Sequence, residues 1–472
     1  MSTRIYYPPS PQPNNPQKKP SNSKKTKGFW IMFGLAGVAM ASATAGALVA
    51  VSIASTPLMQ TNLTPEEEAV FNKGDISTGS TLRLPELARP VNILVLGVKV
   101  LSSDVNNPPP EASNLGYLPL VNSFDGLTDT MLLLRFNPET RQVVVLSLPR
   151  DTRTYIEGYG QTKLNEANVD GGPALAATTV SDLLGGVPID RYVRINVQGV
   201  EKLLDALGGV TVYVPHDMHY QDDSQHLYIN LKQGEQHLSG SEALQFLRFR
   251  HDQYGDIGRI QRQQMMMRSL MEQALSPATL ARLPQILSVI QENIDTNLSV
   301  EELVALTGFA AQTNRSNVQM LMLPGTFSSP DEYTASYWLP SDRRIRQMAA
   351  RYFDVGSATV ADESLPGYVR IAIQNSTDNS EAMQTLIGKL GDSGYTNVFR
   401  DDPWPQSLSV TRIIAQDGDR QTAEALRNAL GIGEVRVEST GSLESDITIQ
   451  LGQDWEQMAD SSSAPSPDEQ SQ

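Results

Sequence analysis

The middle of the chain alternates short aliphatic runs with longer amphipathic segments. Near-continuous Val, Ile and Leu over residues 91–98, 130–136 and 142–148 predict three buried strands. The sequence Asn137–Glu139 predicts the turn that joins the last two strands into a hairpin.

Helical and strand patterns then follow one another towards residue 324. In chain order they predict a helix at 171–185, a strand at 191–197, a helix at 197–209, a strand at 210–214, helices from 259–275 to about 312, and a strand at 318–324. Strands that alternate with helices predict an α/β fold with both faces of the sheet covered. We therefore expect residues 91–355 to form an αβα sandwich.

The segment 367–452 contains an internal repeat. "VRIAIQN" followed by "AMQTLIGKLG" resembles "VTRIIAQD" followed by "TAEALRNALG" about 40 residues later. Each half predicts strand, helix and strand, so the segment is expected to be a small α+β domain of βαβ-βαβ type that serves binding or assembly. Residues 356–366 predict a polar hinge before this domain, and residues 453–472 predict a disordered tail after it.

The N-terminal segment predicts a membrane anchor. Residues 28–55 contain no charged side chain and exceed the roughly 20 apolar residues that span a bilayer. Residues 1–27 hold six basic residues and no acid, which predicts a disordered cytoplasmic tail and an extracytoplasmic or periplasmic body on a single-pass inner-membrane protein. A cleaved signal peptide is the alternative, because "ASATA" offers the small residues of a cleavage site. Residues 56–90 predict a linker with a short helix capped by Thr64.

Composition excludes several kinds of chemistry. The chain has no cysteine, which excludes disulfides, thiolate metal sites and a cysteine nucleophile. Its net charge of −16 becomes −22 once the basic tail is set aside, which argues against nucleic acid as a partner. Four of the five histidines lie between residues 216 and 237, with irregular spacing that favours a surface hairpin over a metal site.

Against this acidic background, residues 247–264 gather arginines. In a helix that begins near Gly258, Arg259, Arg262 and Gln263 share one face close to the positive end of the helix dipole. Guanidinium groups bind phosphate oxygens in a bidentate manner, so this face predicts an anion site.

Two more arginines precede that helix. Arg248 and Arg250 lie two apart and would point to the same side of a strand. The alternative for the whole cluster is a solvated surface paired with Asp252 and Asp256.

Charged residues also flank the predicted hairpin. Arg150 and Arg153 follow its second strand directly, where ligands of α/β sheets collect. Asp129 stands just before its first strand and is a candidate Mg²⁺ ligand, because Mg²⁺ prefers carboxylate and phosphate oxygens. A simple capping aspartate is the alternative.

Seven motifs occur in a fixed order: "NILVLG", "TDTM", "LSLPRDT", "KLNEAN…GGP", "LLDALGGV", "LSGSEALQFLRFRHD" and "GDIGRIQRQQ". Together they resemble the LytR-CpsA-Psr family of membrane-anchored cell-wall glycopolymer transferases over residues 91–325, and residues 367–452 resemble the C-terminal domain that often accompanies it. The resemblance implies an αβα sandwich with a central mixed sheet. It also implies an enzyme that transfers a phospho-glycan from a polyprenyl-pyrophosphate carrier to a hydroxyl of peptidoglycan.

The resemblance also implies roles for single residues. The positions that match the family's pyrophosphate-binding residues are Arg150, Lys163, Arg248, Arg250, Arg259 and Gln263. Asp129 matches a magnesium-binding aspartate, and Asp256 matches an acid of the site; Asp129, Arg150 and Asp256 are the expected catalytic residues.

One position departs from the family. The aspartate expected two residues after the glycine of the first strand, a second metal ligand, is Lys99 here, and Asp104 is a possible substitute. Lys99 would weaken Mg²⁺ binding or replace the metal as a phosphate-binding cation. A non-catalytic protein that binds polyprenyl pyrophosphate or cell wall is therefore the alternative to the transferase, and a transcriptional regulator is disfavoured by the acidic body.

Overall fold

The computed structural model describes residues 58–72, 74–80, 83–99, 124–223, 227–249, 256–274, 282–314, 317–329, 331–356, 366–377, 379–416, 418–442 and 444–463. All of them belong to one compact unit. The predicted cytoplasmic tail, the membrane anchor and most of the predicted hinge lie outside these ranges. Within the described ranges, no helix combines the length and apolarity needed to cross a bilayer.

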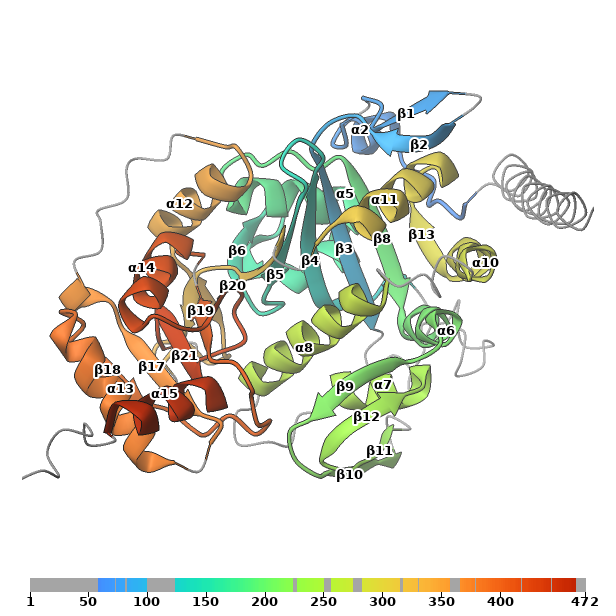
Figure 1. Ribbon diagram of the computed structural model, residues 1–472. Helices are drawn as coiled ribbons and strands as arrows, with labels where there is room; N and C mark the ends of the chain where they lie inside the picture. The colour runs from blue at the N-terminus through green and yellow to red at the C-terminus, as the bar shows by residue number, and fades with distance from the viewer. Residues whose placement is uncertain are drawn as a thin grey trace, which may run out of the picture. The chain divides into compact units, whose positions relative to one another are not determined.

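A six-stranded mixed sheet forms the centre of the larger domain (Figure 1). Its strands, in spatial order, are β13 (Ile294–Thr296), β8 (Arg191–Asn196), β3 (Val91–Lys99), β4 (Leu127–Asn137), β5 (Gln142–Leu148) and β14 (Val318–Met322). The pairs β3/β4, β4/β5 and β8/β13 are antiparallel, whereas β3/β8 and β5/β14 are parallel. The predicted strands and the predicted mixed sheet are confirmed.

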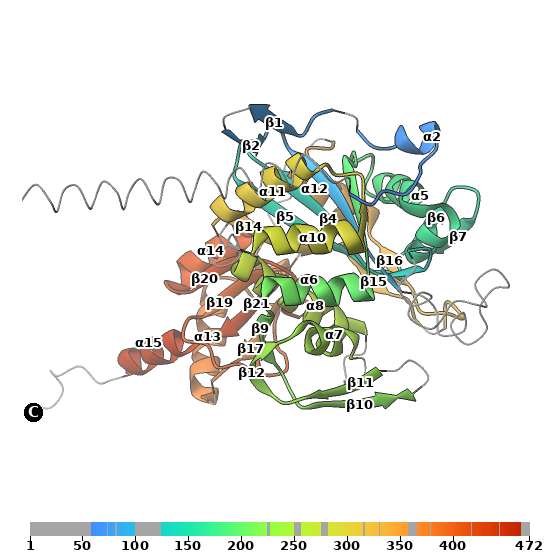
Figure 2. The ribbon, with the colours of Figure 1, turned by 90° about the vertical axis from the view of Figure 1, so that its right-hand side faces the viewer.

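Helices cover both faces of this sheet, because successive strand residues point to opposite sides. Leu94 and Leu96 of β3 share a core with α5 (Ala167–Leu183) and α12 (Asp342–Tyr352). The other face of the sheet packs against α8 (Asp256–Ala274) and α11 (Val300–Gln312). Figure 2 shows the two helical layers on either side of the strands, so the predicted αβα sandwich is confirmed. Two further helices contact this sheet: α6 (Val197–Leu207) packs against β8 and β3, and α10 (Leu283–Asn293) packs against β13.

The predicted linker contains more structure than expected. The short helix α2 (Pro65–Glu68) is present, with Thr64 accepting a hydrogen bond from the Glu67 amide in a capping box. An antiparallel pair, β1 (Ser77–Ser80) and β2 (Arg83–Leu87), follows it and was not predicted.

Small ribbons extend from the sandwich. They are β6 (Arg153–Ile156) with β7 (Gly160–Lys163), β9 (Val210–Val214) with β12 (Gly234–Leu238), β10 (Met218–Asp222) with β11 (Leu227–Leu231), and β15 (Gly325–Phe327) with β16 (Trp338–Pro340). The short 3-10 helix η1 (Leu164–Glu166) follows β7. The β10/β11 pair confirms the surface hairpin expected at the histidine-rich segment.

The prediction of a strand at Arg248 is wrong. Arg248 is the last residue of helix α7 (Gly240–Arg248). Ser239 caps that helix and forms a capping box with Glu242, and the apolar side chains of Ala243 and Phe246 are buried below it. The helical spacing of these apolar residues therefore decides the local structure.

The C-terminal domain is a five-stranded sheet with the order β18-β17-β21-β19-β20. Each half has the predicted strand-helix-strand form: β17 (Ile371–Asn375), α13 (Ser380–Asp392) and β18 (Val398–Arg400), then β19 (Arg412–Ala415), α14 (Arg420–Leu430) and β20 (Glu434–Val437). The fifth strand, β21 (Ile447–Leu451), lies between the two halves and was not assigned to either. A short 3-10 helix, η4 (Pro366–Tyr368), precedes the domain.

The prediction of a disordered tail from residue 453 is also wrong. Helix α15 (Gln453–Ser463) follows β21, and Trp455 is only 1% exposed. Its indole Nε1 donates a hydrogen bond to the Ala382 carbonyl oxygen, at 2.8 Å, which attaches α15 to α13. A single buried tryptophan outweighs the polar composition around it.

Candidate active site

A cavity of about 150 Å³ lies beyond the carboxyl ends of the parallel strands β3 and β8. Gly97 and Val98 line it from β3, and Ile195 and Asn196 line it from β8. The edge of a sheet beyond its parallel strand ends is a common ligand site in α/β folds. Asn196 also caps α6, since its side chain accepts a hydrogen bond from the Gly199 amide at 2.8 Å.

One wall of the cavity is apolar. Helix α6 contributes Val200, helix α7 contributes Leu244 and Leu247, and the β10/β11 hairpin contributes Tyr220 and Leu227. Such a wall can bind a hydrocarbon chain, because contact between the two removes apolar surface from water.

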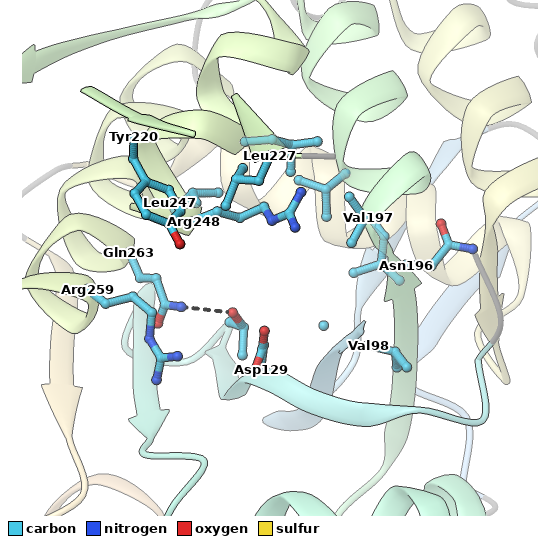
Figure 3. A pocket seen from close by; sticks show the side chains of 15 residues that line it. Val98, Asp129, Asn196, Val197, Tyr220, Leu227, Leu247, Arg248, Arg259 and Gln263 are labelled. Atoms are coloured by element: carbon cyan, nitrogen blue, oxygen red, sulfur yellow. Dashed lines mark hydrogen bonds between the residues drawn. The ribbon is translucent and has the colours of Figure 1, made fainter. Parts of the chain in front are cut away.

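Charged and polar side chains occupy the remainder of the cavity. Asp129 and Thr130 reach it from β4, Arg248 from the end of α7, and Arg259 and Gln263 from the first turns of α8. Figure 3 shows Arg248 beside the apolar wall, with Asp129 and Gln263 across the cavity from it. The Gln263 amide Nε2 donates to the Thr130 hydroxyl at 3.0 Å, which fixes α8 against β4.

A chain of ion pairs continues from Asp129. The Arg150 Nη1 lies 2.5 Å from the Asp129 carboxylate, and the Arg150 Nε lies 3.1 Å from Asp151. The Lys163 Nζ binds the other oxygen of Asp151 at 2.8 Å. Asp151 therefore bridges Arg150 and Lys163, and Arg150 in turn contacts Asp129.

The electrostatics of Asp151 agree with this role. Burial opposes ionisation of the carboxyl, but the hydrogen bond from Lys163 and the charge of Arg150 outweigh it, so the pKa of Asp151 is lowered from its ordinary value. The carboxylate is thus charged at neutral pH and binds both cations. Asp151 was not among the site residues predicted from the sequence, although it is acidic and directly follows Arg150.

The structure places the predicted residues in three groups. Asp129, Arg248, Arg259 and Gln263 line the cavity together, and Arg150 and Lys163 join it through Asp129 and Asp151. The side chains of Asp256 and Lys99, and all of Arg250 and Asp104, lie outside the described residues.

Arg262 shares a helix face with Arg259 in the sequence but has no family match, and it does not line the cavity. Arg262 is 2% exposed, its guanidinium carbon lies 5.4 Å from the ring centre of Phe249, and it donates a hydrogen bond to the Phe249 carbonyl. Arg153 also has a local partner, because its guanidinium carbon lies 5.3 Å from the ring centre of Tyr333.

Carboxylates are few at this cavity. In the ranges that the structure describes, no three acidic or histidine side chains gather closely enough to hold a metal ion by themselves. Asp129 is the one lining carboxylate there, and it also pairs with Arg150. One carboxylate together with the oxygens of a bound phosphate is a usual Mg²⁺ environment, so these residues fit a metal that arrives with its substrate.

Comparison with known proteins identifies the family of this chain. The sequence model described as "LytR_cpsA_psr family" matches residues 57–354, and the model described as "LytR cell envelope-related transcriptional attenuator" matches residues 368–455. The chain is 33% identical over 266 residues to the polyisoprenyl-teichoic acid–peptidoglycan teichoic acid transferase TagU of Oceanobacillus iheyensis, covering 55% of this chain and 73% of that protein. A protein of the same name from Bacillus cereus is 29% identical over 323 residues, covering 67% of this chain and 93% of its own length.

A solved structure is also similar. The crystal structure of Bacillus subtilis TagV superposes with a TM-score of 0.46 and 26% identity, covering 57% of this chain and 99% of that one.

Proposed function

This chain belongs to the LytR_cpsA_psr family, and from that premise we propose that it is a phosphotransferase which moves a glycopolymer from a polyprenyl-pyrophosphate carrier to a hydroxyl of peptidoglycan. The observation that carries the proposal is the cavity itself. An apolar wall from α6, α7 and the β10/β11 hairpin meets Arg248, Arg259 and the Asp129–Arg150 pair. A lipid pyrophosphate has the same two parts, a hydrocarbon chain and an anion.

The reaction needs positioning and charge stabilisation more than it needs a protein nucleophile. The acceptor oxygen forms a bond to the phosphorus that carries the glycan, the bond from that phosphorus to the bridging oxygen breaks, and polyprenyl phosphate leaves. The hydroxyl proton passes to a base, for which Asp129 and Asp256 are the candidates. The arginines hold the phosphate oxygens and stabilise the charge that develops on them.

Within this proposal Arg150 has two tasks. It neutralises Asp129 when the cavity holds no anion, and its guanidinium would stabilise a phosphate oxygen when the substrate binds. Asp151 keeps its guanidinium oriented, through the contact at 3.1 Å, and keeps Lys163 close by.

We propose that Mg²⁺ joins this site with the substrate, held by Asp129 and by pyrophosphate oxygens. The metal would neutralise phosphate charge during transfer. Calorimetric titration of Mg²⁺ should show weak binding to the protein alone and tighter binding with a polyprenyl pyrophosphate present, and Asp129→Asn should abolish the difference. Equal Mg²⁺ affinity with and without the lipid would contradict a metal bound jointly with it.

The transfer assay tests the function directly. The full-length protein, a polyprenyl-pyrophosphate-linked glycan and peptidoglycan should yield polymer covalently attached to peptidoglycan and free polyprenyl phosphate. Arg150→Ala should abolish both products. Lys99 supports a second candidate, a non-catalytic protein that only binds the lipid; saturable lipid binding without either product would favour it.

The proposal extends to location. The uncharged segment 28–55 and the basic residues before it support a single-pass anchor in the cytoplasmic membrane, with the catalytic domain outside. Protease added to right-side-out vesicles should digest the catalytic domain. Protection of that domain until the vesicles are opened would refute the orientation.

A further inference from the structure

A second cavity, of about 310 Å³, lies where the catalytic domain meets the C-terminal domain. Helix α8 lines both cavities: Arg259 and Gln263 face the first, whereas Met265, Arg268 and Ser269 face the second. Arg259 and Arg268 are nine positions apart, which corresponds to about 14 Å along the helix axis. The second cavity therefore lies a few sugar units away from the pyrophosphate site.

Two aromatic side chains line the second cavity. Tyr213 comes from β9 of the catalytic domain, and Trp404 comes from the loop after β18 of the C-terminal domain. The Tyr213 hydroxyl donates a hydrogen bond to the Pro405 carbonyl oxygen at 3.0 Å, and the Trp404 amide donates to the Asn375 carbonyl oxygen at 3.0 Å. The first bond fixes the loop that carries Trp404 to the ribbon that carries Tyr213, and the second fixes it to the end of β17.

Polar groups accompany the aromatic rings. Glu235 lies directly across from Tyr213 in the β9/β12 register, so both side chains are on one face of the ribbon. Ser269 and Gln406 also line the cavity, as do Thr211, Arg412 and Thr440. The side chains of Glu235, Ser269 and Gln406 make no hydrogen bond or ion pair with any residue of the described ranges.

Aromatic faces beside unused donors and acceptors match the chemistry of a sugar ring. The carbon-bound hydrogens of a sugar pack on an aromatic face, and its hydroxyls need hydrogen-bond partners at the rim. A hydrocarbon chain would offer no hydrogen bond to the Glu235 carboxylate or the Gln406 amide. An anion alone would not account for the aromatic rings. Arg268 lines the cavity as well, although it already pairs with Glu438.

We propose that this cavity binds carbohydrate units of a cell-wall polymer, at a distance from the reacting phosphorus. The proposal deepens the proposed function and rests on it for the identity of the polymer. It gives the C-terminal domain a role, because Trp404 and Gln406 come from that domain and the cavity is incomplete without them.

The test measures carbohydrate binding to the full-length protein in detergent by calorimetry. One probe is the peptide-free disaccharide released from peptidoglycan by a muramidase, which represents the acceptor. The other is carrier-free teichoic acid, which represents the transferred polymer. Saturable binding of either probe supports the proposal, and the tighter of the two identifies the source of the sugar.

Variants locate the binding. Trp404→Ala and Gln406→Ala should each weaken carbohydrate binding about tenfold or more, which corresponds to about 1.4 kcal/mol. Tyr368→Ala is the matched control, because Tyr368 is 76% exposed and does not line the cavity; it should bind like the wild type. Gln406→Ala keeps the proposal testable if the tryptophan variant fails to fold.

Two results would overturn the proposal: no saturable binding of either probe, or wild-type affinity in both Trp404→Ala and Gln406→Ala. Polyprenyl-pyrophosphate binding, measured in parallel, should be unchanged in every variant. If the wild type did not bind polyprenyl pyrophosphate, the proposed function would be refuted. The lipid assay therefore distinguishes failure of the proposed function from failure of the carbohydrate site.

Discussion

Arg259 and Arg262 lie three positions apart on α8, but their side chains have different surroundings. Arg259 lines the cavity beside Gln263, whereas Arg262 packs over Phe249 and binds its carbonyl oxygen. The sequence predicted both on one anion-binding face, because helical spacing places them close together. It contained no signal that Phe249, the residue after α7, would contact Arg262 through its ring and its carbonyl oxygen.

Arg262→Lys should therefore destabilise the protein. Lysine keeps the positive charge but loses the planar guanidinium that packs on the Phe249 ring and reaches its carbonyl oxygen. We expect the free energy of unfolding to fall by about 1–3 kcal/mol, because a charge buried at 2% exposure would lose its partners. Denaturant unfolding measures the change, and wild-type stability in this variant would contradict the structural role.

Arg259→Lys and Arg150→Lys should instead weaken lipid binding. Each loses a guanidinium fork that matches phosphate oxygens, so affinity for a polyprenyl pyrophosphate should fall about tenfold or more. Arg346→Lys is the control, because Arg346 is exposed on α12, away from the cavity. Equal lipid affinity in all three variants would mean that the arginines of the cavity do not hold the pyrophosphate.

Asp151 gives a pH-dependent prediction. Its pKa is lowered in the folded protein despite burial, because Lys163 and Arg150 stabilise the charged form. A lowered folded-state pKa contributes stability above the unfolded pKa, near pH 4, and that contribution is lost as pH falls through the folded value. Asp151→Asn should therefore be less stable than the wild type at pH 7, and the difference should shrink as pH falls below about 4. Thermal unfolding across this range measures it; a gap that stays constant with pH would exclude the ionised carboxylate as its cause.

At the scale of elements, long apolar runs were predictable and short or polar segments were not. The strands β3, β4 and β5 appear where uninterrupted aliphatic residues placed them, although β4 begins at Leu127, so Asp129 lies inside the strand. A strand was considered at Arg248 because Arg248 and Arg250 are two positions apart, the spacing that places side chains on one side of a strand. The capping box of Ser239 and Glu242 was the overlooked sign of a helix.

Helix α15 shows how composition can mislead. Its sequence is acidic and rich in serine, but Trp455 packs into the core of the C-terminal domain. Trp455→Ala should cost about 3–5 kcal/mol of unfolding free energy, because it leaves a large cavity. Trp455→Phe keeps most of the packing and loses the bond to the Ala382 carbonyl, so it should cost less. Chemical unfolding of both variants measures this order, and two variants as stable as the wild type would show that α15 does not belong to the folded domain.

At the scale of the whole molecule, the sequence predicted which residues gather but not what joins the two domains. The resemblance of the ordered motifs to the family placed Asp129, Arg248, Arg259 and Gln263 in one site, and all four line the cavity. Contacts between separate domains depend on side-chain shape at surfaces that no periodicity describes. In the folded protein, the Gln261 Nε2 donates to the Gly441 carbonyl oxygen at 3.1 Å, and the Ser439 amide donates to the Met320 carbonyl oxygen at 2.9 Å.

An ion pair between Arg268 on α8 and Glu438 after β20 joins the catalytic domain to the C-terminal domain. Glu438 is 5% exposed, so its carboxylate relies on this arginine for compensation of its charge. Glu438→Gln should lower the free energy of unfolding by about 2 kcal/mol, because the partly buried Arg268 then loses its counter-charge. Glu434→Gln is the matched control: Glu434 lies on β20 itself and pairs with Arg436, but its side chain is 47% exposed, so its loss should cost about 0–1 kcal/mol.

Calorimetric unfolding of the two variants separates these cases. If the pair joins the domains, Glu438→Gln should also make the C-terminal domain unfold at a lower temperature than the catalytic domain, whereas Glu434→Gln should follow the wild type. Matching thermograms for the two variants would show that the domains are held together by other contacts, and that α8 reaches its place in the active site without help from Glu438.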